Sequence, residues 1–452
     1  MAAELKKLEE KYAGRPVVFI GIHSAKFKNE ADPKNIENAI MRYDISHPVV
    51  VDNNMMLWKS YGASGWPTIF IIDPNGKIVF KHSGEGQIDR ICSIIDEIIE
   101  KHSSDGSLKR FDAPVAYKRS RPTSLLYYPS KIAFSPSLKY MAISDSGNNR
   151  IIIAERGTFR VVRIAGNMQA GNIDGQFELA AFNSPQGVAW ASEDKLYVAD
   201  SANHTIRELS LLDGTVKTLA GTGKKQEWPT LGGIGKDAAL NSPWDIVYSK
   251  GRIYIAMAGS HQIWELNPNT NSVHPIAGNG IEGISNGKGE KVEFAQPSGI
   301  SESMEHLYVA DSESSSIRDI NMADMSVATI VGNGLFNFGY LDGDISSAKF
   351  QHPLGICAEI NKIYVADTYN HAIRKIDLLS GIVSTIIAKK SEQSFCDYSS
   401  NECDTLELYE PSDVKYAEDK LYIADTNNHL IRVYDMTKNI LKTIEFTFDN
   451  AR

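Results

Sequence analysis

Histidine and aspartate recur in one sequence context, and both residue types are common ligands of zinc. The context is a short apolar run that ends in a turn, as in YVADSANHTI and YIADTNNHLI. Zinc ligands must converge to about 2 Å from one ion, whereas equivalent positions of a circular repeat lie far apart. We therefore predict that these residues shape the turns of a structural repeat and bind no metal. They are Asp145, Asp200, Asp311, Asp367, Asp425, His204, His261, His371 and His429.

A second group of candidates follows a proline that recurs every 54 to 58 residues. Two places after this proline stand Lys131, Asp245 and Asp413, and the same position holds glycine in three other units. Asp245 and Asp413 belong to the third and sixth units, so across a ring we expect them to lie too far apart to share one ion without help. Our candidate binding residues at the mouth of a central channel are therefore Lys131, Asp245 and Asp413, together with Gln186 and Trp244. The alternative is that these side chains only line a water-filled channel. The prolines are Pro129, Pro185, Pro243, Pro297, Pro353 and Pro411.

The units that carry these residues consist of short β-branched runs bounded by Gly, Pro and Asn, which is typical of strands. About four strands per unit, repeated six times, predict a six-bladed β-propeller over residues 128–452. Gly-rich segments between units, such as AGNGIEGISNGKGEKVEF, are expected to form loops over one face, where binding residues concentrate. We expect the recurring strand arginines to pair with acidic neighbours, which disfavours RNA binding. They are Arg207, Arg318, Arg374 and Arg432.

The first hundred residues follow a different pattern. The apolar run VVFIGI at 17–22 predicts a strand buried on both faces, and TIFIID-PNG-KIVF predicts an antiparallel hairpin. Helical spacing of apolar residues at about 33–43 and 88–100 completes the pattern of an α/β domain over residues 1–102. The polar, Pro- and Ser-containing residues 103–127 predict a linker.

The chain has four cysteines, at positions 92, 357, 396 and 403, and no two of them are spaced CxxC. Thiol–disulfide exchange needs an accessible thiolate, and we expect Cys92 to be buried and structural. So few cysteines are typical of a reducing compartment, and we predict a cytosolic protein. A formal net charge of −9 argues against nucleic acid as a partner, and no apolar run approaches the ~20 residues of a membrane span.

Two stretches resemble known families. GASGWPTIFIIDPNGKIVFKHSGEG resembles the second half of a thioredoxin-like domain, which implies that Pro67 is a structural cis-proline. The pattern VADTxNHxI resembles the NHL repeat, and with GIHSAKF and AMAGSHQIW the chain resembles the NHL repeat-containing protein 2 family over nearly its whole length. That family carries a cysteine pair before its first long thioredoxin helix. We therefore expect residues 1–102 to form a partial thioredoxin-like domain that lacks its first strand and CxxC, ahead of a six-bladed NHL-type propeller.

These observations predict a non-catalytic scaffold, a monomer that binds a protein or peptide through the propeller face and the interdomain cleft. No cofactor is expected, and we expect no enzymatic activity in this form. The first alternative is a thiol–disulfide oxidoreductase whose catalytic cysteines lie in a missing N-terminal segment. A metal-dependent hydrolase or lyase ranks last, because the inner strands contain no histidine and few carboxylates.

Overall fold

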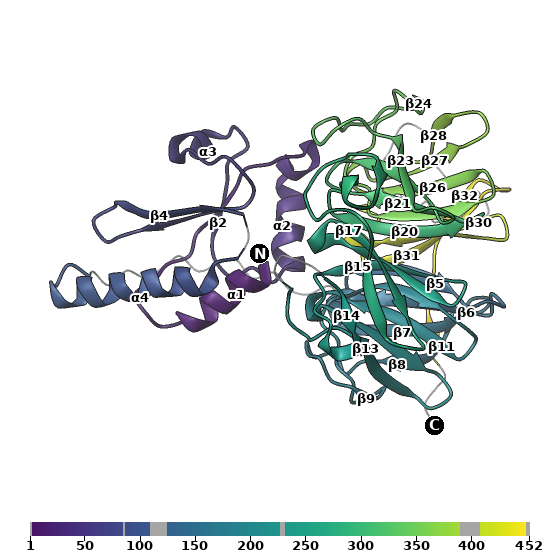
Figure 1. Ribbon diagram of the computed structural model, residues 1–452, viewed down its shortest axis with the longest axis horizontal. Helices are drawn as coiled ribbons and strands as arrows, with labels where there is room; N and C mark the ends of the chain where they lie inside the picture. Colours follow the sequence, from purple (N-terminus) through teal and green to yellow (C-terminus); the bar gives the residue numbers. More distant parts are fainter. Residues whose placement is uncertain (1, 85, 109–123, 227–230, 389–406, 449–452) are drawn as a thin grey trace, which may run out of the picture. The chain divides into compact units, whose positions relative to one another are not determined.

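The computed structural model describes residues 2–84, 86–108, 124–226, 231–388 and 407–448. The chain divides into two compact units, Met1–Pro122 and Thr123–Arg452 (Figure 1). The first unit contains helices and two small sheets, and the second unit is built from strands. The α/β and all-β architectures predicted from the sequence are both present.

In the first unit, two helices cover one face of the strands. Leu8 and Tyr12 of one helix pack with Ile91 and Ile95 of the other, and Phe19 joins them from the adjacent strand segment. Each helix therefore buries the apolar stripe that its sequence spacing predicts. The elements of this unit are α1 (Ala2–Lys11), β1 (Gly21–His23), α2 (Pro33–Arg42), β2 (Val49–Val51), α3 (Met56–Tyr61), β3 (Thr68–Ile72), β4 (Ile78–Ser83) and α4 (Ile88–Ser104).

The strand predicted over 17–22 differs from the structure in both length and burial. Strand β1 starts only at Gly21, and β2 is its partner, in parallel, among the strands that the structure describes, while β3 and β4 form a separate antiparallel hairpin. Val18, Ile20 and Ile22 are exposed, because the described helices α1 and α4 pack against the opposite side of this segment. The expectation of burial on both faces was wrong for this strand.

The second unit is a ring of six antiparallel blades, each a meander of four strands (Figure 1). The innermost strands neighbour one another around the ring, and the sixth lies beside the first. The innermost strands are β5 (Pro129–Phe134), β10 (Pro185–Trp190), β15 (Pro243–Ser249), β20 (Pro297–Ser303), β25 (Gly355–Glu359) and β29 (Asp413–Ala417). The second strands are β6 (Tyr140–Asp145), β11 (Lys195–Asp200), β16 (Arg252–Met257), β21 (His306–Asp311), β26 (Lys362–Asp367) and β30 (Lys420–Asp425).

The outer part of each blade is a second hairpin. The third strands are β7 (Arg150–Glu155), β12 (Thr205–Ser210), β17 (Gln262–Asn267), β22 (Ser316–Asn321), β27 (Ala372–Asp377) and β31 (Leu430–Asp435). The fourth strands are β8 (Arg160–Ala165), β13 (Thr215–Ala220), β18 (Ser272–Ala277), β23 (Ser326–Val331), β28 (Ile382–Ile387) and β32 (Ile440–Thr443).

Within the described parts of the chain, two-residue strands extend five of the blades at their outer edge. In blades 2 to 5 the added strand comes from the preceding inter-blade loop and runs antiparallel to the fourth strand. In blade 1 it comes from the end of the described chain and runs parallel to β8, so this contact ties the sixth blade to the first. The added strands are β9 (Gly175–Gln176), β14 (Gly233–Ile234), β19 (Gly287–Lys288), β24 (Gly343–Asp344) and β33 (Thr447–Phe448).

The meander fixes two faces of the ring. Successive strands alternate in direction, so the turn between the second and third strands and the loop that leaves the fourth strand lie at the same end of each blade. We call this end the loop face. The opposite end carries the turn between the first and second strands and the turn between the third and fourth, and we call it the hairpin face.

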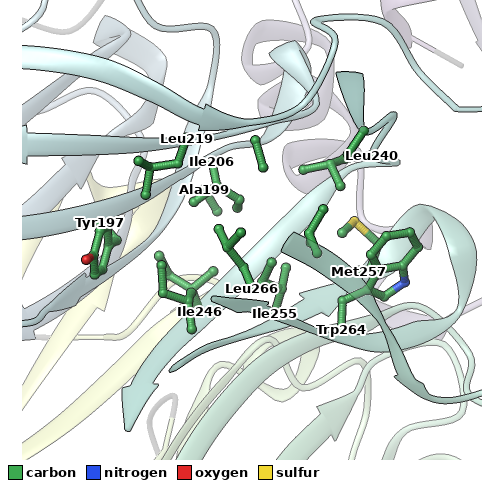
Figure 2. Packing of buried hydrophobic residues seen from close by; sticks show 14 of the residues in the cluster. Tyr197, Ala199, Ile206, Leu219, Leu240, Ile246, Ile255, Met257, Trp264 and Leu266 are labelled. Carbon is green, nitrogen blue, oxygen red and sulfur yellow. The ribbon is translucent and has the colours of Figure 1, made fainter. Parts of the chain in front are cut away.

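The hydrophobic core lies between the blades. Each of six clusters joins side chains of two neighbouring blades, including the pair formed by the sixth and the first. In Figure 2, Ala199 and Ile206 of blade 2 face Ile246 and Ile255 of blade 3, and Trp264 closes the cluster. A blade therefore buries its sheet only against its neighbours, which explains why the repeat closes into a ring.

Candidate functional site

The repeated aspartate ends the second strand and is buried in each of the five blades that have it. In blade 2, Asp200 Oδ1 accepts the backbone N–H of Asn183 at 2.8 Å, and Oδ2 accepts the side-chain amide of Asn203 at 2.8 Å. Asn183 precedes the opening proline of the same blade by two residues. The carboxylate thus fixes the entry of the chain into the blade. The backbone N–H that Asp200 binds thus lies before the blade and not in the turn that follows the aspartate.

The strand arginine seven residues after the aspartate completes this arrangement. Arg207 donates to Asp200 Oδ2 at 2.7 Å, and its other donors reach the carbonyl of Ile173 at 2.8 Å and Asp174 at 2.9 Å. Both of those residues belong to the inter-blade loop before blade 2. Arg318 and Arg374 bind their own aspartate and the preceding loop in the same way. The expected pairing of arginines with acidic neighbours is confirmed, and the same arginines also hold the preceding loops through their backbone carbonyls, which no local sequence pattern indicated.

Burial shifts the titration of these carboxyls upward. Desolvation raises the pKa of Asp200, Asp311 and Asp367 to about 6, although the paired arginine and the hydrogen bonds oppose it. The pKa values of Asp145 and Asp425 are raised for the same reason. These are properties of carboxyls that hold the fold, since each one is enclosed by protein donors.

The repeated histidine joins one blade to the next. The Nδ1 atom of His204 accepts the backbone N–H of Ser242, the residue before the opening proline of blade 3, at 3.0 Å. In the same way, the backbone N–H groups of Gln296, Glu410 and Tyr128 donate to the Nδ1 atoms of His261, His371 and His429, respectively. The last of these closes the ring between blades 6 and 1. In blade 1 Asn149 and in blade 4 Ser315 supply the acceptor instead.

The left-handed position of the turn is occupied by the histidine. His204 has φ 53°, and in blade 1 Asn149 has φ 51° at the equivalent place. The preceding Asn203 lies in a 3₁₀ turn (Ser201–Asn203), and its amide donates both to Asp200 and to the carbonyl of Gly171. Every aspartate and histidine of the repeat therefore has a partner within the fold.

The candidate residues near the axis do not form an open channel mouth. Lys131, Asp245 and Asp413 are 1%, 2% and 0% exposed, respectively. The Nζ atom of Lys131 lies 3.1 Å from Asp245 Oδ2 and 4.0 Å from Asp413 Oδ1, so the lysine bridges two carboxylates that we expected to be separate. Gln186 accepts the hydroxyl of Ser130 and is buried, while Trp244 is partly exposed.

The electrostatics of this cluster are balanced by a second lysine. Lys415 Nζ lies 3.3 Å from Asp413 Oδ1 and donates to the carbonyl of Ile356 at 3.2 Å. Burial raises the pKa of Asp413 even though both lysines favour its charged form. Burial lowers the pKa of Lys415, but the carboxylates of Asp413 and Asp245 outweigh it and raise that pKa overall.

Residues that redox chemistry would need are enclosed. Cys92 and Cys357 are free and buried, and Cys396 and Cys403 lie outside the described residues. Burial raises the pKa of Cys357 to about 11, which suppresses its thiolate.

The Trp66–Pro67 peptide bond is cis, and the Trp66 indole N–H donates to the carbonyl of Ser24 at 2.7 Å. Within the described ranges, no cluster of three or more His, Cys, Asp or Glu side chains has the geometry of a metal site.

Comparison with known proteins decides the family. A family model described as thioredoxin-like matches residues 1–78, and the NHL repeat model matches residues 182–209, 240–266, 350–376 and 408–434. NHL repeat-containing protein 2 of Gallus gallus is 36% identical over 98% of this chain and 65% of its own length. The chain belongs to the family of NHL repeat-containing protein 2. The NHL repeat model does not match blades 1 and 4, and these are the two blades in which asparagine or serine stands in place of the histidine.

Other relatives widen this family. Protein SUPPRESSOR OF QUENCHING 1, chloroplastic, of Arabidopsis thaliana is 39% identical over 96% of this chain and 43% of its own length. Thiol-disulfide oxidoreductase ResA of Bacillus thuringiensis is 31% identical over 21% of this chain and 51% of its own length. The chain thus spans between two fifths and two thirds of the relatives that match it almost throughout. Because the name of this plant relative says chloroplastic, the cytosolic location of the present chain stays a prediction. Among the described helices, none has the length and apolar character to cross a membrane.

Proposed function

We propose that the propeller binds a protein or peptide partner through its loop face. The observation that carries this proposal is an arrangement of exposed apolar side chains on loops that buried arginines hold in place. Ile173 is 52% exposed while its carbonyl accepts Arg207 at 2.8 Å, and Leu341 is 47% exposed while its carbonyl accepts Arg374 at 2.8 Å. A loop fixed before binding loses little conformational entropy when a partner arrives.

The other inter-blade loops extend this apolar surface. Met168, Ile281 and Phe336 are 45%, 58% and 72% exposed. Each of these three residues follows the end of a fourth strand by a few positions, so we place them at the loop face together with Ile173 and Leu341. Exposed apolar patches rimmed by polar residues mark protein interaction sites more often than chance surface does. The NHL-repeat family of the relatives is consistent with such a role.

The experiment compares two variants of the full chain in affinity capture from cells of its own source. The double variant Ile173→Asp and Leu341→Asp places charges on the loop face. The control variant Leu212→Asp and Leu379→Asp places the same charges on the hairpin face, where both leucines are at least 80% exposed. We expect a set of proteins to be lost from the loop-face variant and kept by the control.

Purified members of that set then bind the wild type and the control with equal affinity, and the loop-face variant at least about tenfold more weakly. Equal capture by all three proteins would overturn the loop face as the binding site. Loss from the control alone would move the site to the hairpin face.

A further inference from the structure

The axis of the propeller holds a cation that belongs to the chain itself. Lys131 extends from the innermost strand of blade 1, and its Nζ donates to the carbonyl of Ser298 in blade 4 at 3.0 Å and to that of Leu354 in blade 5 at 2.6 Å. The carboxylates of Asp245 in blade 3 and Asp413 in blade 6 lie at 3.1 Å and 4.0 Å. The ammonium thus sits in a cage of oxygens contributed by four other blades.

Glycines bring these oxygens to the axis. A Cβ on Gly299 would lie 2.7 Å from the carbonyl oxygen of Leu354, and a Cβ on Gly355 would lie 2.5 Å from the Cα of Asp413. Both distances are shorter than a side chain tolerates, so only glycine allows the innermost strands to approach this closely. The three charged residues fill the space that the glycines leave at the same level of the ring.

One carboxylate oxygen of the cage accepts no hydrogen bond from the residues that the structure describes. Asp413 Oδ1 is buried and accepts none, although the ammonium groups of Lys415 and Lys131 lie 3.3 Å and 4.0 Å away. The other carboxylate oxygens are bound by backbone: Asp413 Oδ2 accepts the N–H of Ile132, and Asp245 Oδ2 accepts that of Ile300. Carboxylates and backbone carbonyls without nitrogen or sulfur are the ligand set that Ca²⁺ prefers.

We propose that this oxygen cage is a cation site of calcium-like chemistry that Lys131 occupies with its own ammonium. The chain needs no metal ion to close the ring, because the lysine supplies the positive charge at the point where the innermost strands converge. Shortening Lys131 to alanine removes this charge and is expected to leave space for about two or three water molecules. The same oxygens then become available to a divalent cation. This inference concerns the axis and is independent of the loop face.

The test uses the full chain with Lys131→Ala, and thermal unfolding with and without calcium chloride in excess over EDTA. We expect Lys131→Ala to unfold at a lower temperature than the wild type in EDTA. Calcium at about 100 times its dissociation constant should raise that temperature by roughly 5 °C. The wild type should unfold at the same temperature in both buffers, since its cage is full.

Two matched variants separate a site from a general effect of salt. Lys131→Met keeps the volume of the side chain without its charge, so it should be destabilised and should not respond to calcium. Lys131→Ala combined with Asp413→Asn replaces a charged carboxylate by a neutral amide with a single oxygen, so the response should weaken by at least about tenfold in calcium concentration. If Lys131→Ala is recovered unfolded, refolding in 10 mM calcium chloride against EDTA becomes the measurement.

No calcium response in Lys131→Ala, an equal response in Lys131→Met or in the wild type, or refolding that fails in both buffers would overturn the proposal. Magnesium serves as a further probe, because it demands closer octahedral geometry than this cage offers. A magnesium response equal to that of calcium would contradict the calcium-like assignment.

Discussion

Blades 2 and 3 are neighbours that solve the same structural problem in different ways. In blade 2, Asp200 and Arg207 form a buried ion pair at 2.7 Å. In blade 3 the equivalent positions are Met257 and Trp264, and both side chains are fully buried (Figure 2). The backbone pairing is the same, since Ala199 faces Ile206 in one blade and Ala256 faces Ile263 in the other. The blade fold therefore does not require the ion pair.

Blade 3 replaces the missing polar partners locally. The Trp264 indole N–H donates to Gln262 at 3.0 Å, and the amide of Gln262 donates to the carbonyl of Gly278 at 3.1 Å. The side-chain amide of Asn241 donates to the carbonyl of Gly259. Position 259 has room for glycine only, because a Cβ there would lie 2.1 Å from Asn241 Oδ1. These substitutions leave the apolar pair enclosed and its polar neighbours bound.

Blade 3 lacks the arginine side chain that, in blade 2, donates hydrogen bonds to the preceding inter-blade loop. Arg207 ties the loop before blade 2 through Ile173 and Asp174, whereas Trp264 has no donor to spare for the loop before blade 3. Buried ion pairs contribute little net stability over well-packed apolar residues, and removing one partner is far more costly than replacing both. We infer that the pair is kept in blades 2, 4 and 5 because its arginine also positions a loop.

The largest effect is expected from breaking the pair on one side. Arg207→Met leaves the Asp200 carboxylate buried without its cation, and we expect the free energy of unfolding to fall by about 3–5 kcal/mol. Chemical denaturation of the full chain measures it. In blade 3, Met257→Leu conserves volume and should cost less than about 1.5 kcal/mol. Comparable losses in the two variants would contradict the contrast between the blades.

The second prediction places the apolar pair of blade 3 at the equivalent positions of blade 2. The double variant Asp200→Met and Arg207→Trp should recover at least about 2 kcal/mol of the loss seen in Arg207→Met, because no charge remains buried. A double-mutant cycle with Asp200→Met gives the coupling between the two sites. Amide hydrogen exchange should nevertheless become faster in the loop around Ile173, whose clamp is gone. A double variant as unstable as the single one, or with an unchanged loop, would refute the argument.

A smaller effect is expected at the histidine that joins the blades. His204→Asn should change stability by less than about 0.5 kcal/mol, because Asn149 makes the equivalent bond in blade 1 at a similar φ. His204→Ala removes the acceptor of the Ser242 N–H and places alanine in the left-handed region, so we expect a loss of about 1–2 kcal/mol. Thermal unfolding of both variants checks the difference. Equal losses would show that the hydrogen bond contributes nothing.

The repeat, its six blades and the pairing of arginines were accessible from the sequence because they depend on local patterns. The isoleucine, aspartate and arginine positions recur at fixed offsets, and Met257 and Trp264 depart together. The partner of each aspartate was not accessible, because the N–H it binds lies up to 18 residues earlier in the chain. The bridge made by Lys131 was also missed, since its ammonium contacts residues far away in the chain, such as Leu354 at a separation of 223 positions, and depends on how closely the glycines let the strands approach.

The last prediction concerns pH and the carboxyl of Asp200, whose burial is only partly offset by Arg207 and two hydrogen-bond donors. An unfolded aspartate titrates near pH 4, whereas burial raises the pKa of Asp200 to about 6 in the folded chain. The folded state therefore holds this proton more tightly. Its contribution to the free energy of unfolding is fully present below about pH 4 and is lost as pH rises through 6.

Blade 3 has no carboxyl at this position, so the double variant Asp200→Met and Arg207→Trp should show a smaller fall in the free energy of unfolding between pH 4 and 7 than the wild type. In the wild type Asp174 ionises below this window: burial opposes its ionisation, but hydrogen bonds from Lys236 and Thr218 and the charge of Arg207 lower its pKa to about 2. Denaturation curves at half-unit steps of pH give both slopes. An equal or steeper fall in the double variant would mean that Asp200 stays ionised throughout, and that the ion pair, not burial, sets its charge.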